Sequence, residues 1–198
     1  MTKLRLAQRF SNIILASESP RRADLLKQIG LEFHACPSGI IETHSARTSP
    51  AEVVEELARM KAQSVAQNLK QGLIIGADTT VVINREIVGK PKNNRHAVEI
   101  LRRLSGIRHH VITGVTLLDI DRKQEIVWSE STLVHFRRLR ESEILDYVES
   151  HEVLDKAGGY GIQDSAAAFV SRIEGCYFNV VGLPLARLVD NLWELAES

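Results

Sequence analysis

Two adjacent arginines stand at the start of a predicted helix, where positive charge is unfavourable. In the stretch LASESPRRADLL (residues 15–26), Ser19 and Pro20 suit the N-cap and the first position of a helix. Arg21 and Arg22 then fall in its first turn, which unpaired N–H groups and the helix dipole already make positive. A phosphate group would bind the cap serine, the amides and both guanidinium groups. The alternative is that the arginines lie on a solvated face of the helix.

Two more charged residues interrupt apolar patterns. Lys61 lies in the apolar stripe of the helix predicted to begin at Ser49, so it reaches the surface, pairs with a carboxylate or meets a phosphate. Asp78 lies in LIIGADTTVVI, a predicted strand that is apolar on both faces, and it also needs partners. It forms a buried salt bridge or caps a turn at Gly76, or else it is a metal ligand or general base at the end of a strand.

Further polar residues lie in two predicted loops. Lys90 follows a turn in VGKP, and DKAGGYGIQ carries Asp155, Lys156 and Gln163 around its glycines. The sequence contains no G-x-x-x-x-G-K-[ST] phosphate loop, no G-x-G-x-x-G dinucleotide fingerprint and no G-x-S-x-G nucleophile elbow. Any phosphate chemistry must therefore depend on carboxylates, basic side chains and a hard metal ion.

Apolar runs and helical patterns alternate through the first hundred residues, which predicts an α/β sheet covered by helices. The second half is richer in strands. Residues 109–120 and 125–136 form a predicted antiparallel hairpin, so the sheet should be mixed rather than purely parallel. Shorter helices are predicted at 141–150 and 184–196. We find no repeat or linker and expect one domain over residues 1–198.

Composition excludes several classes of protein. The 25 basic and 25 acidic residues leave no net charge to hold a nucleic acid polymer. Cys36 and Cys176 are too far apart in sequence for a C-x-x-C pair, and His109 and His110 alternate faces on a strand and cannot bind one metal together. No charged leader with an apolar core opens the chain, and no apolar run approaches the length of a membrane span. We expect a soluble, cytoplasmic protein.

Eight segments together resemble the Maf family of nucleoside triphosphate pyrophosphatases, also known as septum formation inhibitors. They occur in the order of the family, and the resemblance covers nearly the whole chain. In order, these segments are LASESPRRADLL, the acidic Glu42 in GIIET, LARMKA, GADTTVV, GKP, LSGIRHHVITGV, DKAGGYGIQ and NVVGLPL. GADT together with GIQ resembles the branch that hydrolyses dTTP and UTP.

The resemblance implies an elongated, twisted mixed sheet flanked by helices, forming two lobes around a central cleft as in inosine triphosphatases. It also implies attack of water on the α-phosphorus, assisted by Mg²⁺ or Mn²⁺, with a nucleoside monophosphate and pyrophosphate as products. The protein would act as a homodimer on a nucleoside triphosphate, without a nucleic acid or membrane partner.

The resemblance also implies roles for individual residues. Asp78 matches the proton acceptor, which with Glu42 would bind the metal, and Lys61 and Lys90 complete the catalytic group. The positions tied to substrate choice are matched by Arg21, Thr79 and Gln163. The phosphate-binding positions are matched by Ser17, Ser19, Arg22, Lys61 and Lys90.

Three residues depart from the family pattern. Ile41 stands where many relatives have a second acid before Glu42, and Val153 replaces a proline. Asp164 replaces the glycine after GIQ, so we expect a negative charge near the base pocket. Residues 1–11 precede the first strand of the family, and we expect them to form a disordered or docking extension. Two alternatives to a dTTP/UTP pyrophosphatase are a nucleotide-binding regulator of cell division without turnover, and a pyrophosphatase for another base such as 7-methyl-GTP.

Overall fold

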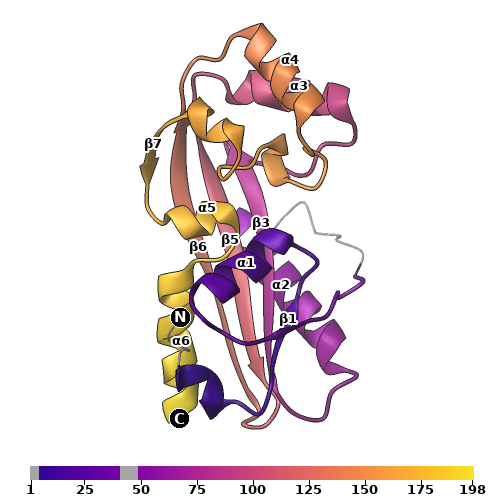
Figure 1. Ribbon diagram of the computed structural model, residues 1–198, viewed down its shortest axis with the longest axis vertical. Helices are drawn as coiled ribbons and strands as arrows, with labels where there is room; N and C mark the ends of the chain where they lie inside the picture. Colours follow the sequence, from indigo (N-terminus) through magenta and orange to yellow (C-terminus); the bar gives the residue numbers. More distant parts are fainter. Residues whose placement is uncertain (1–4, 41–48) are drawn as a thin grey trace. The chain divides into compact units, whose positions relative to one another are not determined.

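The computed structural model describes residues 5–40 and 49–198, and its centre is a seven-stranded sheet with helices packed on it (Figure 1). The strands are β1 (Ile13–Ala16), β2 (His34–Ala35), β3 (Leu73–Ile83), β4 (Glu86–Val88), β5 (Arg108–Asp119), β6 (Gln124–Phe136) and β7 (Val170–Glu174). The α-helices are α1 (Pro20–Gln28), α2 (Pro50–Ala66), α3 (Asn94–Leu104), α4 (Glu141–Ser150), α5 (Tyr177–Val181) and α6 (Leu185–Glu197). The 3-10 helices are η1 (Arg5–Arg9), η2 (Ala157–Gly159) and η3 (Ser165–Phe169).

The sheet is mixed, as predicted. Its strand order is β2-β1-β3-β5-β6-β7, and β4 pairs with β3 outside this path. β1 runs parallel to β2 and β3, whereas β4 is antiparallel to β3 and β7 is antiparallel to β6. The predicted pair of strands at 109–120 and 125–136 corresponds to the neighbours β5 and β6, which are joined at residues 120–123. The expected α/β class is therefore confirmed.

The chain divides into two compact units. Unit 1 contains Met1–Asp78, Thr113–Glu130 and Gly182–Ser198, and unit 2 contains Thr79–Ile112 and Ser131–Val181. The strands β3, β5 and β6 contribute residues to both units.

Helix α2 packs very closely on the sheet of unit 1, because two strands present glycine to it. A Cβ atom at Gly76 of β3 would come within 2.2 Å of the carbonyl oxygen of Ala58. One at Gly114 of β5 would come within 2.3 Å of the Val54 backbone. Backbone-to-backbone contact of this kind requires glycine on the strand. It places the next turn of α2, which carries Lys61, directly against β3.

The starts of the first two α-helices agree with the sequence. At α2, the predicted capping box is present: the Ser49 amide donates to Glu52 Oε2 at 2.8 Å, and the Glu52 amide donates to Ser49 Oγ at 3.3 Å. Helix α1 begins at Pro20 with Ser19 in the N-cap position, as expected. The expected side-chain cap is missing there, because the Ser19 hydroxyl makes no capping hydrogen bond.

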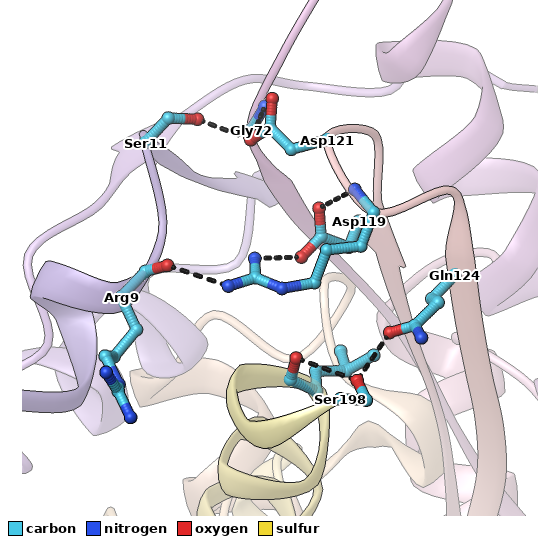
Figure 2. A network of polar contacts seen from close by, with 9 residues as sticks. Arg9, Ser11, Gly72, Asp119, Asp121, Gln124 and Ser198 are labelled. Atoms are coloured by element: carbon cyan, nitrogen blue, oxygen red, sulfur yellow. Dashed lines mark hydrogen bonds and ion pairs between the residues drawn. The ribbon is translucent and has the colours of Figure 1, made fainter.

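Polar contacts tie the ends of the described chain to the β5–β6 connection in unit 1. Figure 2 shows the Ser11 hydroxyl and the Gly72 amide donating to Asp121 Oδ2, at 2.6 and 3.1 Å. The Ser198 hydroxyl donates to Gln124 Oε1 at 2.8 Å in the same view. Ser11, just before β1, and the C-terminal Ser198 are therefore bound to Asp121 in this connection and to Gln124 at the start of β6.

The first described residues are packed rather than extended. Leu6 in η1 is fully buried, and Phe10 lies under the guanidinium of Arg122. Arg122 also donates to the Arg9 carbonyl at 3.2 Å and to the buried carboxylate of Asp119 at 2.8 Å. The described part of the expected N-terminal extension thus contributes Leu6 and Phe10 to the core of unit 1.

Unit 2 has its own core. Helices α3 and α4 lie side by side (Figure 1), and Arg102 of α3 forms an ion pair with Glu141 of α4. The ring of His109 on β5 is buried edge-on against Phe136, and its Nε2 atom lies 2.7 Å from the hydroxyl of Tyr160. This aromatic cluster joins β5, β6 and the segment that follows η2.

Candidate active site

Lys61 and Asp78 form a buried ion pair in unit 1. The Nζ atom of Lys61 lies 2.6 Å from Oδ1 of Asp78, and both residues are only 8% exposed. Asp78 is two residues beyond Gly76 on β3, so the two residues face the same side of the strand, the side that α2 covers. Lys61 therefore does not extend into solvent; it pairs with a carboxylate, one of the options left open by the sequence.

Arg22 is buried beside the end of β1. It is 8% exposed; its Nε donates to the carbonyl of Gly182 at 2.9 Å, and one terminal nitrogen donates to Ser17 Oγ at 3.1 Å. The backbone amide of Ser19 also donates to Ser17 Oγ, at 3.2 Å. Arg22 is thus not part of a solvated helix face. Guanidinium, hydroxyl and amide groups are gathered at the start of α1, which suits an anion.

The register of the sheet brings the Lys61–Asp78 pair and the Arg22–Ser17 contact to the same end of neighbouring strands. β1 and β3 are parallel neighbours, with Ala16 opposite Gly76. Ser17 directly follows Ala16, and Asp78 lies two residues after Gly76. Adjacent strands are about 4.8 Å apart, so Ser17 and Asp78 are close to each other at the carboxyl end of β1. That end is where open α/β sheets bind their ligands.

The other predicted site residues of α1 and β3 lie next to this cluster in the chain. Arg21 is in the first turn of α1 and is half-buried, next to Arg22. Thr79 follows Asp78 in β3, is also half-buried, and is the first residue of unit 2. Glu42 and Ile41 lie outside the described residues.

Lys90 and Gln163 belong to unit 2 and are exposed. The loop of Lys90 contacts the glycine-rich segment: the Gly158 amide donates to the Gly89 carbonyl at 3.1 Å. Gly158 has a φ of +71°, and a Cβ atom there would lie 2.8 Å from the Val81 side chain. Glycine is therefore required both by conformation and by space. The GKP and DKAGG segments are far apart in sequence but lie in contact in unit 2.

The contact of Arg22 with the Gly182 carbonyl was not foreseen. Gly182 belongs to the segment NVVGLPL, which carries part of the family resemblance, but a backbone acceptor has no side-chain chemistry by which a sequence would reveal it. The hydroxyl of Tyr147, which holds the segment around Gln163, was also missed. A tyrosine at an apolar position of a helix is read as core.

In the described part of the chain, no three His, Cys, Asp or Glu side chains are grouped so that they could hold a metal ion. Of the two predicted metal ligands, Asp78 lies within the described residues and Glu42 does not. Magnesium is commonly held by one or two carboxylates together with substrate phosphates. The single carboxylate of Asp78 is compatible with that kind of cation site, in which a bound phosphate would supply further oxygens. Within residues 5–40 and 49–198, no helix is long and apolar enough to cross a membrane.

Comparison with known proteins identifies the family of this chain. Residues 12–195 match the sequence family described as "Maf-like protein". A protein of Ruminiclostridium cellulolyticum named dTTP/UTP pyrophosphatase is 50% identical over 188 residues, which cover 94% of this chain and 97% of that protein. A Pelotomaculum thermopropionicum protein of the same name is 51% identical over 180 residues, 91% of this chain and 94% of its own. The solved structure of the Staphylococcus aureus Ham1 protein is 18% identical with a TM-score of 0.48, covering 64% of this chain and 72% of its own. Because the family match spans the sheet and every described site residue, the chain belongs to the Maf family.

Proposed function

We propose that the protein hydrolyses dTTP and UTP to the nucleoside monophosphate and pyrophosphate. The observation that carries the proposal is the buried Lys61–Asp78 pair, which lies at one sheet edge with Arg22 and Ser17. The relatives are about half identical to this chain over nearly its full length, and their names support the choice of dTTP and UTP.

The chemistry of the reaction suits these side chains. The oxygen of a water molecule forms a bond to the α-phosphorus, and the bond from the α-phosphorus to the oxygen that bridges to the β-phosphate breaks. Asp78 accepts the proton of the water, while Lys61 holds its carboxylate in a fixed orientation. Arg22 and the amides at the start of α1 bind phosphate oxygens and neutralise their charge.

A divalent cation, Mg²⁺ or Mn²⁺, is part of the proposal. Asp78 would hold it together with Glu42 and oxygens of the triphosphate. When bound, the cation neutralises charge that develops on the phosphates during the reaction. The resemblance to the family and the oxygen donors of the site support this assignment.

Gln163 is proposed to recognise the base. Its amide offers a donor and an acceptor side by side, which match the O4 and N3–H groups shared by uracil and thymine. Cytosine presents the opposite pattern, although an amide that turns over can pair with it too. Arg21 and Thr79 are proposed to contribute to substrate choice with Gln163. The resemblance further supports a cytoplasmic location and a homodimer. Light scattering of the purified protein tests whether it is a dimer.

A panel of nucleoside triphosphates tests the function directly. Each is incubated with the protein and Mg²⁺ or Mn²⁺, and released pyrophosphate is measured. We expect release from dTTP and UTP, more slowly from CTP, and least from purine nucleotides. If no nucleotide releases pyrophosphate under either metal, the enzymatic proposal is wrong. If nucleotides bind without release, the regulatory alternative replaces it.

A further inference from the structure

One tyrosine holds both sides of the short segment that carries Gln163. The hydroxyl of Tyr147 accepts a hydrogen bond from the Gly161 amide at 3.0 Å and donates to the Asp164 carboxylate, at 3.1 and 3.2 Å from its two oxygens. Gln163 lies between these two residues in the chain and is exposed. The Gly161 backbone on one side of Gln163 and the Asp164 side chain on the other are thus bound to the same hydroxyl of α4.

Tyr147 is itself fixed in place. It is 3% exposed, packs edge-on against Phe169 at 5.2 Å and stacks on His151 with a 4.5 Å separation of ring centroids. His151 also contacts Ser165, the first residue of η3, at 3.0 Å from Nε2 to Oγ. Burial raises the pKa of Tyr147, so its hydroxyl keeps its proton and can donate to a carboxylate. The hydroxyl that binds Gly161 and Asp164 therefore belongs to a buried ring packed between Phe169 and His151.

The Asp164 carboxylate accepts hydrogen bonds from other residues of unit 2. Besides Tyr147, its Oδ1 accepts from the Ala166 amide at 2.9 Å and so caps η3. A Cβ atom at residue 161 would lie 2.5 Å from Asp164 Oδ2, so glycine at this position lets the carboxylate lie closely over the backbone. The sequence suggested that this unusual aspartate places a negative charge beside the base. The structure adds that both carboxylate oxygens accept internal hydrogen bonds, from Tyr147 and from the Ala166 amide.

We propose that Tyr147 and Asp164 are positioning residues that fix the Gln163 segment and so set the selectivity for the base. The inference rests on the proposed function of Gln163. A segment held in place before binding loses less conformational entropy when it pairs with a base. If the segment is released, this entropic cost weakens binding of the base that Gln163 matches more than binding of other bases. Releasing the segment therefore weakens binding of UTP more than binding of the phosphates alone.

The test uses Tyr147→Phe, which removes only the hydroxyl, and Asp164→Asn, which keeps the size and one acceptor oxygen. We measure kcat and KM for UTP and CTP, and the inhibition constant of tripolyphosphate, which has no base. Each variant should lower the ratio of kcat/KM for UTP over CTP about tenfold, chiefly through KM for UTP. Inhibition by tripolyphosphate should not change. Tyr177→Phe, the same change at an exposed tyrosine of unit 2, should behave like the unmodified protein.

A Gln163→Ala background separates positioning from general damage. If Tyr147 acts through Gln163, then Tyr147→Phe has no further effect on selectivity in Gln163→Ala. An unchanged selectivity in both positioning variants, while Gln163→Ala loses it, overturns this inference and leaves the proposed function standing. A loss of equal size in the Gln163→Ala background also overturns it. Absence of pyrophosphate release from the unmodified protein overturns the proposed function first, before any variant is compared. Thermal unfolding identifies a variant that fails to fold, and the other variant then decides.

Discussion

The ammonium of Lys61 and the carboxylate of Asp78 are 2.6 Å apart in a region where each residue is 8% exposed. The two residues come from different elements, α2 and β3, that pack backbone against backbone at Gly76. Ion pairs removed from water are expensive to form and are strongly destabilising when one partner is removed. The same ion pair therefore contributes to the stability of unit 1 and to the proposed chemistry.

Removing the ammonium should destabilise the protein. In Lys61→Met the carboxylate of Asp78 stays buried and loses its closest cation, which should lower the free energy of unfolding by about 3 kcal/mol. Urea unfolding measures the change. Lys27→Met is the matched control, because Lys27 pairs with Asp24 where both side chains are about two-thirds exposed, and it should leave stability almost unchanged. Equal stability of the two variants would show that the buried pair is energetically unimportant.

A methyl group at Gly76 should separate the pair without touching either member. The new Cβ atom would meet the Ala58 carbonyl at 2.2 Å, so α2 has to move away from β3. We expect Gly76→Ala to lose about 3 kcal/mol of stability and most of its pyrophosphate release. Gly89→Ala has open space around its added Cβ and should fold as stably as the unmodified protein. Normal activity in a folded Gly76→Ala protein would contradict the account of how the pair is assembled.

Acid should destabilise the protein through His109. Burial, with smaller contributions from His110 and His135, lowers its pKa from 6.5 to about 4 in the folded state. The unfolded chain therefore binds a proton more readily between these values, and stability falls as the pH drops from 6.5 towards 4. The loss is on the order of 3 kcal/mol.

Urea unfolding at several pH values measures this effect in the unmodified protein and in His109→Gln. The variant should be less stable at pH 7 and should lack the His109 part of the decline below pH 6.5. His34→Gln, at an exposed histidine, should keep the full decline. An identical decline in His109→Gln would show that this ring is not the group that titrates.

The sequence predicted the helix starts near the site better than it predicted the contact between Lys61 and Asp78. A helix start with Pro20 and the Ser49 capping box depend on neighbouring residues, and both are present. The sequence also indicated that Lys61 and Asp78 each need a partner. It did not indicate that each is the partner of the other, because that contact follows from the close approach of α2 to Gly76, a tertiary feature.

Other features escaped prediction for related reasons. The Ser19 side chain was expected to cap α1, but its backbone amide instead binds Ser17 at the end of β1. His109 was considered only as a metal ligand, because its burial against Phe136 arises from strand neighbours far away in sequence. Asp164 was judged by its charge alone, and its partner Tyr147 lies 17 residues earlier, on α4.

Asp78→Asn tests whether Asp78 accepts the proton of the attacking water. Asparagine keeps the shape of the side chain and lacks the basic oxygen. Pyrophosphate release from UTP is measured in a single turnover, and binding is measured with a UTP analogue whose α,β-bridging oxygen is replaced by methylene. Asp24→Asn serves as an exposed control. We predict that Asp78→Asn binds the analogue within several-fold of the unmodified protein and releases pyrophosphate at least about a hundredfold more slowly. Release at the unmodified rate would contradict the account.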